Sequence, residues 1–192
     1  MKRIATDIPE VVLLKPKLFR DDRGWFCETY NESVLADLGI TDKFVQDNES
    51  ASCYGVVRGL HFQKGEHAQA KLVRVLAGEI LDVAVDVRKG SPTFGKSVAC
   101  RLSAENHLQI YVPKGFAHGF SVLSESAVVA YKCSALYAPS SEGSIAADDP
   151  KLAIDWMVPA EEQIRSPKDL RAGSFADYCA VPAFQYELGT GK

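Results

Sequence analysis

Between about residues 71 and 137, apolar and polar side chains repeatedly alternate along short segments that turn residues separate. Lys71–Ala77 alternates in this way. Ile80–Val87 follows after a glycine, with apolar residues on one face and Asp82 and Asp86 on the other. A period of two is typical of half-buried strands, because successive side chains point to opposite faces of a sheet.

The same region predicts an all-β architecture. Four further strands are expected, at Lys96–Leu102, Leu108–Val112, His118–Leu123 and Ala127–Leu136. Many short strands with regular turns are typical of an antiparallel sandwich or barrel, and the lack of alternating strand–helix units argues against a doubly wound fold. We therefore predict a cupin-type jelly-roll barrel with short peripheral helices and an N-terminal arm.

The chain of 192 residues suits a single domain. We expect an N-terminal arm over about residues 1–43, a jelly-roll core over 44–150 and a mixed tail over 151–192. One clear helix is predicted at Glu32–Leu38, with Asn31 as its N-cap and Gly39 at its end. Shorter helices are expected near Pro159–Ile164 and Pro167–Leu170.

Composition narrows the function classes. The fractions of hydrophobic and charged residues, 46% and 24%, are ordinary for a soluble globular protein. A net charge of -3 argues against nucleic acid as a partner. The five cysteines are scattered without a CxxC pair, which predicts reduced thiols. Because no signal-peptide core or membrane-spanning apolar run is present, we expect a cytoplasmic protein without a membrane partner.

The segment Gly55–Gln63 places a guanidinium and an imidazole close together in a strand-like run. Strict alternation puts Arg58 and His61 on opposite faces, so they share a cavity only if Gly59 allows a kink or bulge. Arginine suits a diphosphate because its fork donates two parallel hydrogen bonds. Histidine suits proton abstraction because its pKa is close to neutral. On spacing alone, a surface arginine and a structural histidine are slightly favoured over a catalytic pair, because the motif is short.

A PxGxxH run, Pro113–His118, is similar to the second motif of cupins, in which the histidine is often a metal ligand. A metal-binding cupin also needs an HxH pair on an earlier strand, and the stretch from His61 to Gly78 has none. Lys71 lies in the same stretch, and its ammonium would repel a divalent cation. We therefore predict a cupin pocket without a metal, although a site built from His61, His118 and a carboxylate stays open.

Two more segments carry candidate groups. Tyr131 follows a run of small apolar residues, where a tyrosine is more often part of the core than a catalyst. Lys168 and Asp169 stand together in the tail, where a lysine can bind phosphate and a carboxylate can orient a histidine. Taken alone, the tail residues also fit ordinary surface charges.

Together these segments resemble the dTDP-4-dehydrorhamnose 3,5-epimerase family over nearly the whole chain. The resemblance rests on the order and spacing of these motifs: Phe19–Glu28, Phe44–Ser50, Arg58–Gln63, Asp82–Arg88, Gly90–Gly95, Gly115–Phe120, Tyr131–Cys133, Asp148–Pro150 and Lys168–Asp169. It implies a dimeric cupin that needs no cofactor and inverts C3 and C5 of dTDP-4-dehydro-6-deoxy-D-glucose, giving dTDP-4-dehydro-L-rhamnose.

The resemblance also implies a role for each candidate. His61 matches the base, Asp169 the carboxylate that holds the imidazole, Tyr131 the proton donor on the opposite face of the sugar ring, and Lys71 the charge that steadies the enolate oxygen. Positions that contact the sugar nucleotide are matched by Gln46, Asp47, Asn48, Arg58, His118, Glu142 and Lys168. Phe19, Arg23 and Glu28 lie on the arm, which in this family tends to reach into the partner's site.

Two positions depart from the family pattern. Ala147 stands where the family commonly has tryptophan, and Ala51 where it often has a basic residue. The expected catalytic set is intact, so the departures bear on the sugar and on whether one or both carbons invert. The alternatives are a monoepimerase or ketoisomerase of the same fold, a non-catalytic cupin that binds sugar nucleotides, and a metal-dependent cupin dioxygenase or isomerase.

Overall fold

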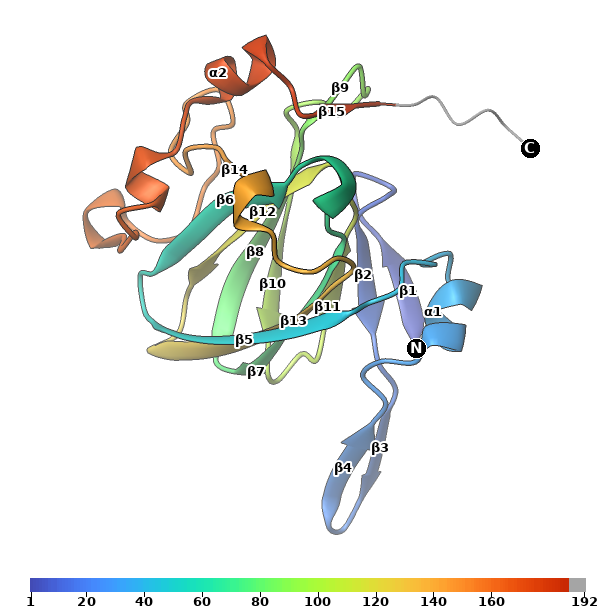
Figure 1. Ribbon diagram of the computed structural model, residues 1–192. Coiled ribbons are helices and arrows are strands. Elements are labelled where there is room, and N and C mark those ends of the chain that lie inside the picture. The colour runs from blue at the N-terminus through green and yellow to red at the C-terminus, as the bar shows by residue number, and fades with distance from the viewer. Residues whose placement is uncertain (187–192) are drawn as a thin grey trace.

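The computed structural model describes residues 1–186, whose main body is two facing antiparallel sheets (Figure 1). The larger sheet has the order β1-β2-β11-β7-β13-β5, with β1 at Lys2–Ala5, β2 at Val12–Lys15, β11 at Gln109–Val112, β7 at Lys71–Ala77, β13 at Ser126–Cys133 and β5 at Gln46–Cys53. The smaller sheet has the order β10-β8-β12-β6-β14, with β10 at Ser97–Ser103, β8 at Glu79–Asp86, β12 at Phe116–Val122, β6 at Val57–Gln63 and β14 at Glu142–Ser144.

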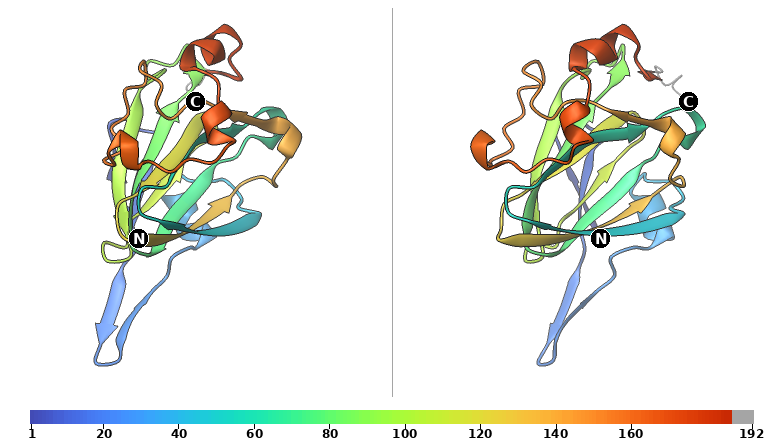
Figure 2. Two further views of the ribbon diagram at one scale, coloured as in Figure 1. Left: turned by 90° about the vertical axis from the view of Figure 1, so that its left-hand side faces the viewer. Right: turned by 60° about the vertical axis from the view of Figure 1, so that its left-hand side comes forward.

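Smaller elements surround the sheets. The strands β3 (Leu18–Asp21) and β4 (Gly24–Cys27) form a hairpin that projects from the body in all three views (Figures 1 and 2). A short parallel pair joins β9 (Arg88–Lys89) to β15 (Phe184–Gln185). The helices are α1 (Glu32–Asp37) and α2 (Phe175–Ala180), and the 3-10 turns are η1 (Gly65–His67), η2 (Pro139–Ser141), η3 (Ala160–Glu162) and η4 (Asp169–Arg171).

The hydrophobic core has two main parts. Between the sheets lies a cluster that includes Val73, Ile80, Ala84 and Val129. A second cluster joins the other face of the smaller sheet to the chain after residue 150, and includes Leu81, Val83, Val85, Trp156, Phe175 and Tyr178. The tail therefore covers the smaller sheet on the side away from the larger sheet, as Figure 2 shows.

The predicted all-β jelly roll is confirmed, and the predicted strand Lys71–Ala77 matches β7 at both ends. The half-buried character predicted for Ile80–Val87 is wrong, because β8 is buried on both faces. Its apolar face packs under the tail, while Asp82 and Asp86 lie on the inner face with no exposed surface. Each carboxylate is compensated by polar partners: Asp82 by the buried His118, and Asp86 by the partly buried Arg88 and two hydroxyls.

The segment predicted as an arm, residues 1–43, divides into three parts. β1 and β2 pair within the larger sheet, and only the β3–β4 hairpin projects. The predicted helix is α1, where the Asn31 side chain accepts a hydrogen bond from the Val34 amide at 3.2 Å. Gly39, with φ of +85°, follows the helix in the left-handed region that favours glycine.

The tail is less regular than its sequence suggests. The two helices predicted there are the 3-10 turns η3 and η4, whereas α2 was not predicted. A capping box between Ser174 and Asp177 begins α2. The last part of the predicted tail, residues 187–192, lies outside the described residues.

Candidate functional site

A register shift in β6 brings Arg58 and His61 to the same cavity. Its pairing with β12 shifts between His118, which faces His61, and Phe120, which faces Arg58. Gly59 stands at the shift with φ of +120°, and a Cβ there would lie 2.6 Å from the Gly119 Cα. Only glycine fits this close approach, so the condition that the sequence set for a shared cavity is met.

The cavity lies between the sheets and has a volume of about 490 Å³. A smaller hollow adjoins it, and the two share His61, Lys71, Tyr131 and Lys168. We call the two together the central cleft. His61 comes from the smaller sheet, Lys71 and Tyr131 from the larger sheet, and Lys168 from the tail. Three separate parts of the fold therefore meet at one place.

His61 and Asp169 form a close pair in the cleft. The His61 Nε2 lies 2.7 Å from the Asp169 Oδ1, and the carboxylate is almost fully buried. Because a carboxylate only accepts, the imidazole proton belongs on Nε2, which leaves the lone pair on Nδ1. Burial lowers the pKa of His61 below 6.5; Asp169 opposes this effect, while Lys71 and Lys168 add to it. The ring is therefore a neutral base at pH 7.

Lys71 and Tyr131 stand next to each other on β7 and β13. The Lys71 Nζ lies 5.9 Å from the centre of the Tyr131 ring. Burial lowers the pKa of Lys71, although Cys133, Asp82 and Glu142 work against this shift. Burial also raises the pKa of Tyr131, with a further contribution from Cys133, so the phenol keeps its proton at neutral pH. The cleft thus combines one base, one amine and one phenolic acid.

His118, at the end of the PxGxxH run, also lines the cleft. Its Nε2 lies 3.0 and 2.9 Å from the two oxygens of Asp82, and both side chains are buried. The alternating pattern did not mark Asp82, because it predicted a half-buried strand with both aspartates on the exposed face; an aspartate among valines and alanines is the signal that could have found it. Among residues 1–186, no group of three or more His, Cys, Asp or Glu side chains is arranged to hold a metal ion.

Five of the residues predicted to contact the sugar nucleotide line the central cleft besides His118. They are Gln46, Asn48, Arg58, Glu142 and Lys168. Lys168 donates to both oxygens of Glu142, at 2.6 and 2.7 Å. Burial opposes the charged form of Glu142, but hydrogen bonding to Lys168 outweighs burial and its pKa is lowered. Arg58 donates only to the neutral Ser52 hydroxyl and the Ala51 carbonyl, so its charge has no carboxylate partner within residues 1–186.

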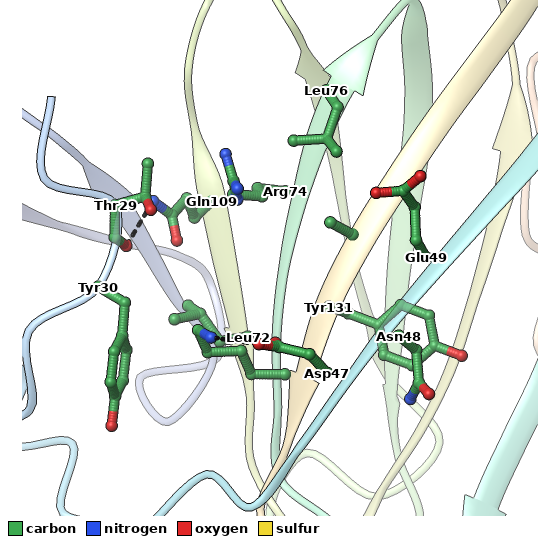
Figure 3. Close-up of a pocket in the computed structure, with 12 residues that line it drawn as sticks. Thr29, Tyr30, Asp47, Asn48, Glu49, Leu72, Arg74, Leu76, Gln109 and Tyr131 are labelled. Atoms are coloured by element: carbon green, nitrogen blue, oxygen red, sulfur yellow. Dashed lines mark hydrogen bonds and ion pairs between the residues drawn. The ribbon is translucent and has the colours of Figure 1, made fainter. Parts of the chain in front are cut away.

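Asp47 lies on the opposite face of β5 from Asn48, because neighbouring side chains alternate along a strand. Its carboxylate pairs with Lys132 at 2.8 Å in a separate hollow of about 370 Å³ on the outer face of the larger sheet. Figure 3 shows this hollow, with Thr29 and Gln109 at the left of the view and Glu49 and Asn48 at the right. Asp47 therefore does not line the central cleft, although Asn48 and Tyr131, which do, also border this hollow.

The predicted arm residues are also away from their own chain's cleft. Phe19 and Arg23 lie on the projecting hairpin, where Arg23 pairs with Asp21 at 2.6 Å. Glu28 follows β4 and accepts a hydrogen bond from Asn31 at 3.2 Å. None of the three lines either part of the central cleft.

Several cleft residues were not singled out by the sequence analysis. They include Tyr137, whose amide donates to the Gln46 side chain, and Arg165 and Ser166 from the tail. Arg165 pairs with Asp148 at 2.7 Å. The signal that could have found Ser166 is its place three residues before Asp169, the spacing at which a serine hydroxyl meets a following amide.

With this geometry established, comparison with known proteins identifies the family. Residues 5–177 match the family model described as dTDP-4-dehydrorhamnose 3,5-epimerase. The chain belongs to this family. It is therefore an isomerase of the epimerase class.

Three similar proteins illustrate the match. A dTDP-4-dehydrorhamnose 3,5-epimerase from Salmonella typhimurium is 55% identical over 154 residues, which are 80% of this chain and 84% of that one. The crystal structure of a dTDP-6-deoxy-D-glucose-3,5-epimerase from Legionella pneumophila, in complex with dTDP-4-keto-L-rhamnose, has a TM-score of 0.92 at 50% identity and covers 97% of this chain and 98% of that one. A 3'-monoepimerase from Streptomyces bikiniensis, in complex with dTDP-quinovose, has a TM-score of 0.86 at 30% identity, covering 94% and 91%.

A search of residues 1–186 for helices that could cross a membrane finds none that is both long and apolar enough. All five cysteines are free thiols, and Cys133 is the buried one among them.

Proposed function

We propose that this protein catalyses the epimerisation of dTDP-4-dehydro-6-deoxy-D-glucose at C3 and C5, giving dTDP-4-dehydro-L-rhamnose without a cofactor. The proposal rests on one observation: the His61–Asp169 pair, Lys71 and Tyr131 all line the same cleft. The double inversion agrees with the names of relatives near 50% identity, whereas the monoepimerase is only 30% identical.

The chemistry follows from the C4 ketone of the substrate. Protons on C3 and C5 are acidic because both carbons flank that carbonyl. His61 removes one proton, the C–H electron pair becomes the enolate double bond, and the charge moves to the C4 oxygen. The Lys71 ammonium stabilises that oxygen, and a buried cation does so better than one in water. Tyr131 then returns a proton to carbon from the opposite face, which inverts the centre, and exchange with solvent restores His61 and Tyr131.

The remaining cleft residues bind the nucleotide in this proposal. Arg58 has a guanidinium without a carboxylate partner among the described residues, and its fork suits the diphosphate. Gln46, Asn48, His118, Glu142 and Lys168 hold the sugar and nucleoside through hydrogen bonds. The five free cysteines suit the reducing cytoplasm, where we place the enzyme.

We also propose that the active form is a homodimer in which the β3–β4 hairpin completes the partner's cleft. The hairpin leaves the body and carries three exposed aromatic side chains, Phe19, Trp25 and Phe26. Exposed aromatic groups on a projecting element favour an interface, because burying their surface stabilises the contact. The arm residues Phe19, Arg23 and Glu28 would then reach a substrate that they cannot reach in their own chain.

The direct test is incubation with dTDP-4-dehydro-6-deoxy-D-glucose in D₂O, with NMR following deuterium at C3 and C5 separately. We expect deuterium and inversion at both carbons. Exchange at one carbon alone would establish a monoepimerase, and no exchange at either carbon would overturn the proposed function.

The base is tested in the same assay. His61→Ala should lower turnover by about 10²- to 10⁴-fold, the usual contribution of a general base. His67→Ala is the matched control, because His67 lies in η1 with its side chain 43% exposed and lines neither part of the cleft. Near-normal exchange by His61→Ala would remove His61 from its assigned role.

A further inference from the structure

The tail segment before Asp169 is attached to β6, the strand that carries His61. The Val57 amide donates to the Ile164 carbonyl at 2.9 Å, and the Ile164 amide donates to the Gly55 carbonyl at 2.8 Å. This short parallel bridge places Ser166 at the wall of the central cleft. Ser166 is therefore held near the catalytic pair by backbone contacts that do not involve its own side chain.

The Ser166 hydroxyl contacts Asp169 in two ways. It donates to the Asp169 Oδ2 at 2.6 Å, and it accepts from the Asp169 amide at 3.1 Å. The other carboxylate oxygen, Oδ1, lies 2.7 Å from the His61 Nε2. Within residues 1–186, no other side chain or amide makes a polar contact with this carboxylate, which is only 6% exposed.

His61, like Asp169, makes few polar contacts. Its Nδ1 is buried and has no hydrogen-bond partner among the described residues, so the 2.7 Å ion pair with Asp169 is the one polar side-chain contact of the ring within residues 1–186. A carboxylate can rotate about its Cβ–Cγ bond unless its oxygens are held. The direction of the imidazole thus depends on Asp169, and the direction of Asp169 depends on one hydroxyl.

From this chain of contacts we infer that Ser166 is a positioning residue, whose hydroxyl holds Asp169 toward His61 and thereby aims the base at the substrate. The inference rests on the proposed function, in which His61 is the base. Ser166 itself touches neither proton donor nor enolate in this scheme. Ser174 makes the same two contacts with Asp177 at the start of α2, where they form a cap. Ser166 differs in that the carboxylate it holds also contacts the imidazole of His61.

The charged groups around His61 make the role measurable. Lys71 on β7 and Lys168 at the start of η4 lower the pKa of His61, whereas Asp169 raises it. Glu142 on β14 and His118 on β12 also face this part of the cleft. If Asp169 turns away, His61 loses the neighbour that raises its pKa, while both lysines remain. The pH at which protonation of the base abolishes activity should then fall.

The test compares Ser166→Ala, Ser166→Thr, Asp169→Asn and the double variant Ser166→Ala with Asp169→Asn. For Ser166→Ala we expect kcat to fall about 10- to 100-fold, the effect of losing a hydrogen bond to a charged group. The acid limb of its pH profile should move to lower pH, the KM should stay within about twofold, and binding of dTDP alone should be unchanged. Ser166→Thr, which keeps a hydroxyl, should restore most of the rate.

The double variant separates positioning from a structural role. If Ser166 acts through Asp169, Ser166→Ala should cost nothing further in the Asp169→Asn background, because residues that act as one unit are not additive. Additive losses, or an unmoved acid limb, would overturn the inference. If Ser166→Ala does not fold, Ser166→Cys replaces it in the test. A cysteine has a similar volume, but its thiol is a poor hydrogen-bond donor.

The two proposals fail in different ways. If the wild-type protein exchanges no deuterium at C3 or C5, the proposed function fails. If the wild-type protein exchanges deuterium and Ser166→Ala behaves like it, only the role of Ser166 fails.

Discussion

Burial acts in opposite directions on the base and the acid of the proposed proton path. It lowers the pKa of His61 from 6.5, so the imidazole is ready to accept a proton at pH 7. It raises the pKa of Tyr131 from 10.0, so the phenol retains a proton to give. Burial also lowers the pKa of Lys71 from 10.5, although nearby acidic groups oppose the shift. The two shifts both favour loss of the Lys71 proton ahead of the Tyr131 proton as the pH rises.

We expect a bell-shaped pH profile of kcat. Activity should fall on the acid side below pH 6.5, as His61 gains a proton, and on the alkaline side below pH 10.5, as Lys71 loses one. Lys71→Arg should lower kcat but move the alkaline limb upward, because a guanidinium stays charged above pH 12. Tyr131→Phe should lower kcat by about 10²- to 10⁴-fold and leave the limb in place. An alkaline limb that Tyr131→Phe abolishes would belong to the phenol instead.

At the scale of elements, the β3–β4 hairpin exposes three large aromatic side chains to solvent. Phe26 is 67% exposed, and Phe19 and Trp25 are each about half exposed. Arg23 on the same hairpin has its only ion pair within residues 1–186 with Asp21, another hairpin residue. The hairpin contacts the body through Trp25, whose ring centre lies 4.6 Å from that of His107, whereas Arg23 pairs within the hairpin. The exposed remainder suits an arm that another subunit receives.

Mixing two defective variants tests this exchange of arms. Phe19→Ala subunits keep an intact cleft, and His61→Ala subunits keep an intact hairpin. In a mixed dimer, the cleft of the first receives the hairpin of the second. Random mixing should restore about one quarter of wild-type activity, since half the dimers are mixed and each has one intact site. If mixing restores no activity, each hairpin serves the cleft of its own chain. Val181→Ala removes another exposed apolar side chain and should remain fully active.

The residues that the sequence predicted well are those whose surroundings are local. The alternating pattern correctly predicted both ends of β7. Asn31 caps α1 through the amide three residues further along the chain. Alternation failed for β8, because the second layer over it comes from residues after 150. For the same reason, the sequence did not predict that Asp82 is buried beside His118. Family resemblance marked the segment around Asp47 and Asn48, but only the observed β5 shows which of the two faces the cleft.

At the scale of the whole molecule, the catalytic groups come from both sheets and the tail, so the site exists only when all three are packed. Asp86, the last residue of β8, contributes to this packing. Its oxygens accept hydrogen bonds from Arg88 at 2.7 Å, from Ser91 at 2.6 Å and from Thr93 at 2.6 Å. Arg88 in turn lies between the rings of Phe116 and Tyr186, and pairs with Glu10 at 3.1 Å. One carboxylate thus links β8, the N-terminal segment and the end of the described chain.

Asp86→Asn should destabilise the protein by about 2–3 kcal/mol at pH 7, because it leaves the partly buried Arg88 with Glu10 as its one counter-charge among the described residues. Burial opposes ionisation of Asp86, but hydrogen bonds from Arg88, Ser91 and Thr93 outweigh burial and lower its pKa below 3.8. The stabilisation is therefore complete above pH 3.8 and is lost as the pH falls through the lowered pKa.

Urea unfolding at several pH values measures this dependence. The difference in free energy of unfolding between wild type and Asp86→Asn should be constant from pH 7 to about pH 5 and shrink in stronger acid. Asp47→Asn is the matched control, because Asp47 is 69% exposed in its pair with Lys132, and exposed pairs contribute about 0–1 kcal/mol. A difference that grows toward low pH would mean that Asp86 is protonated in the folded protein, and that hydrogen bonding without charge holds the three segments together.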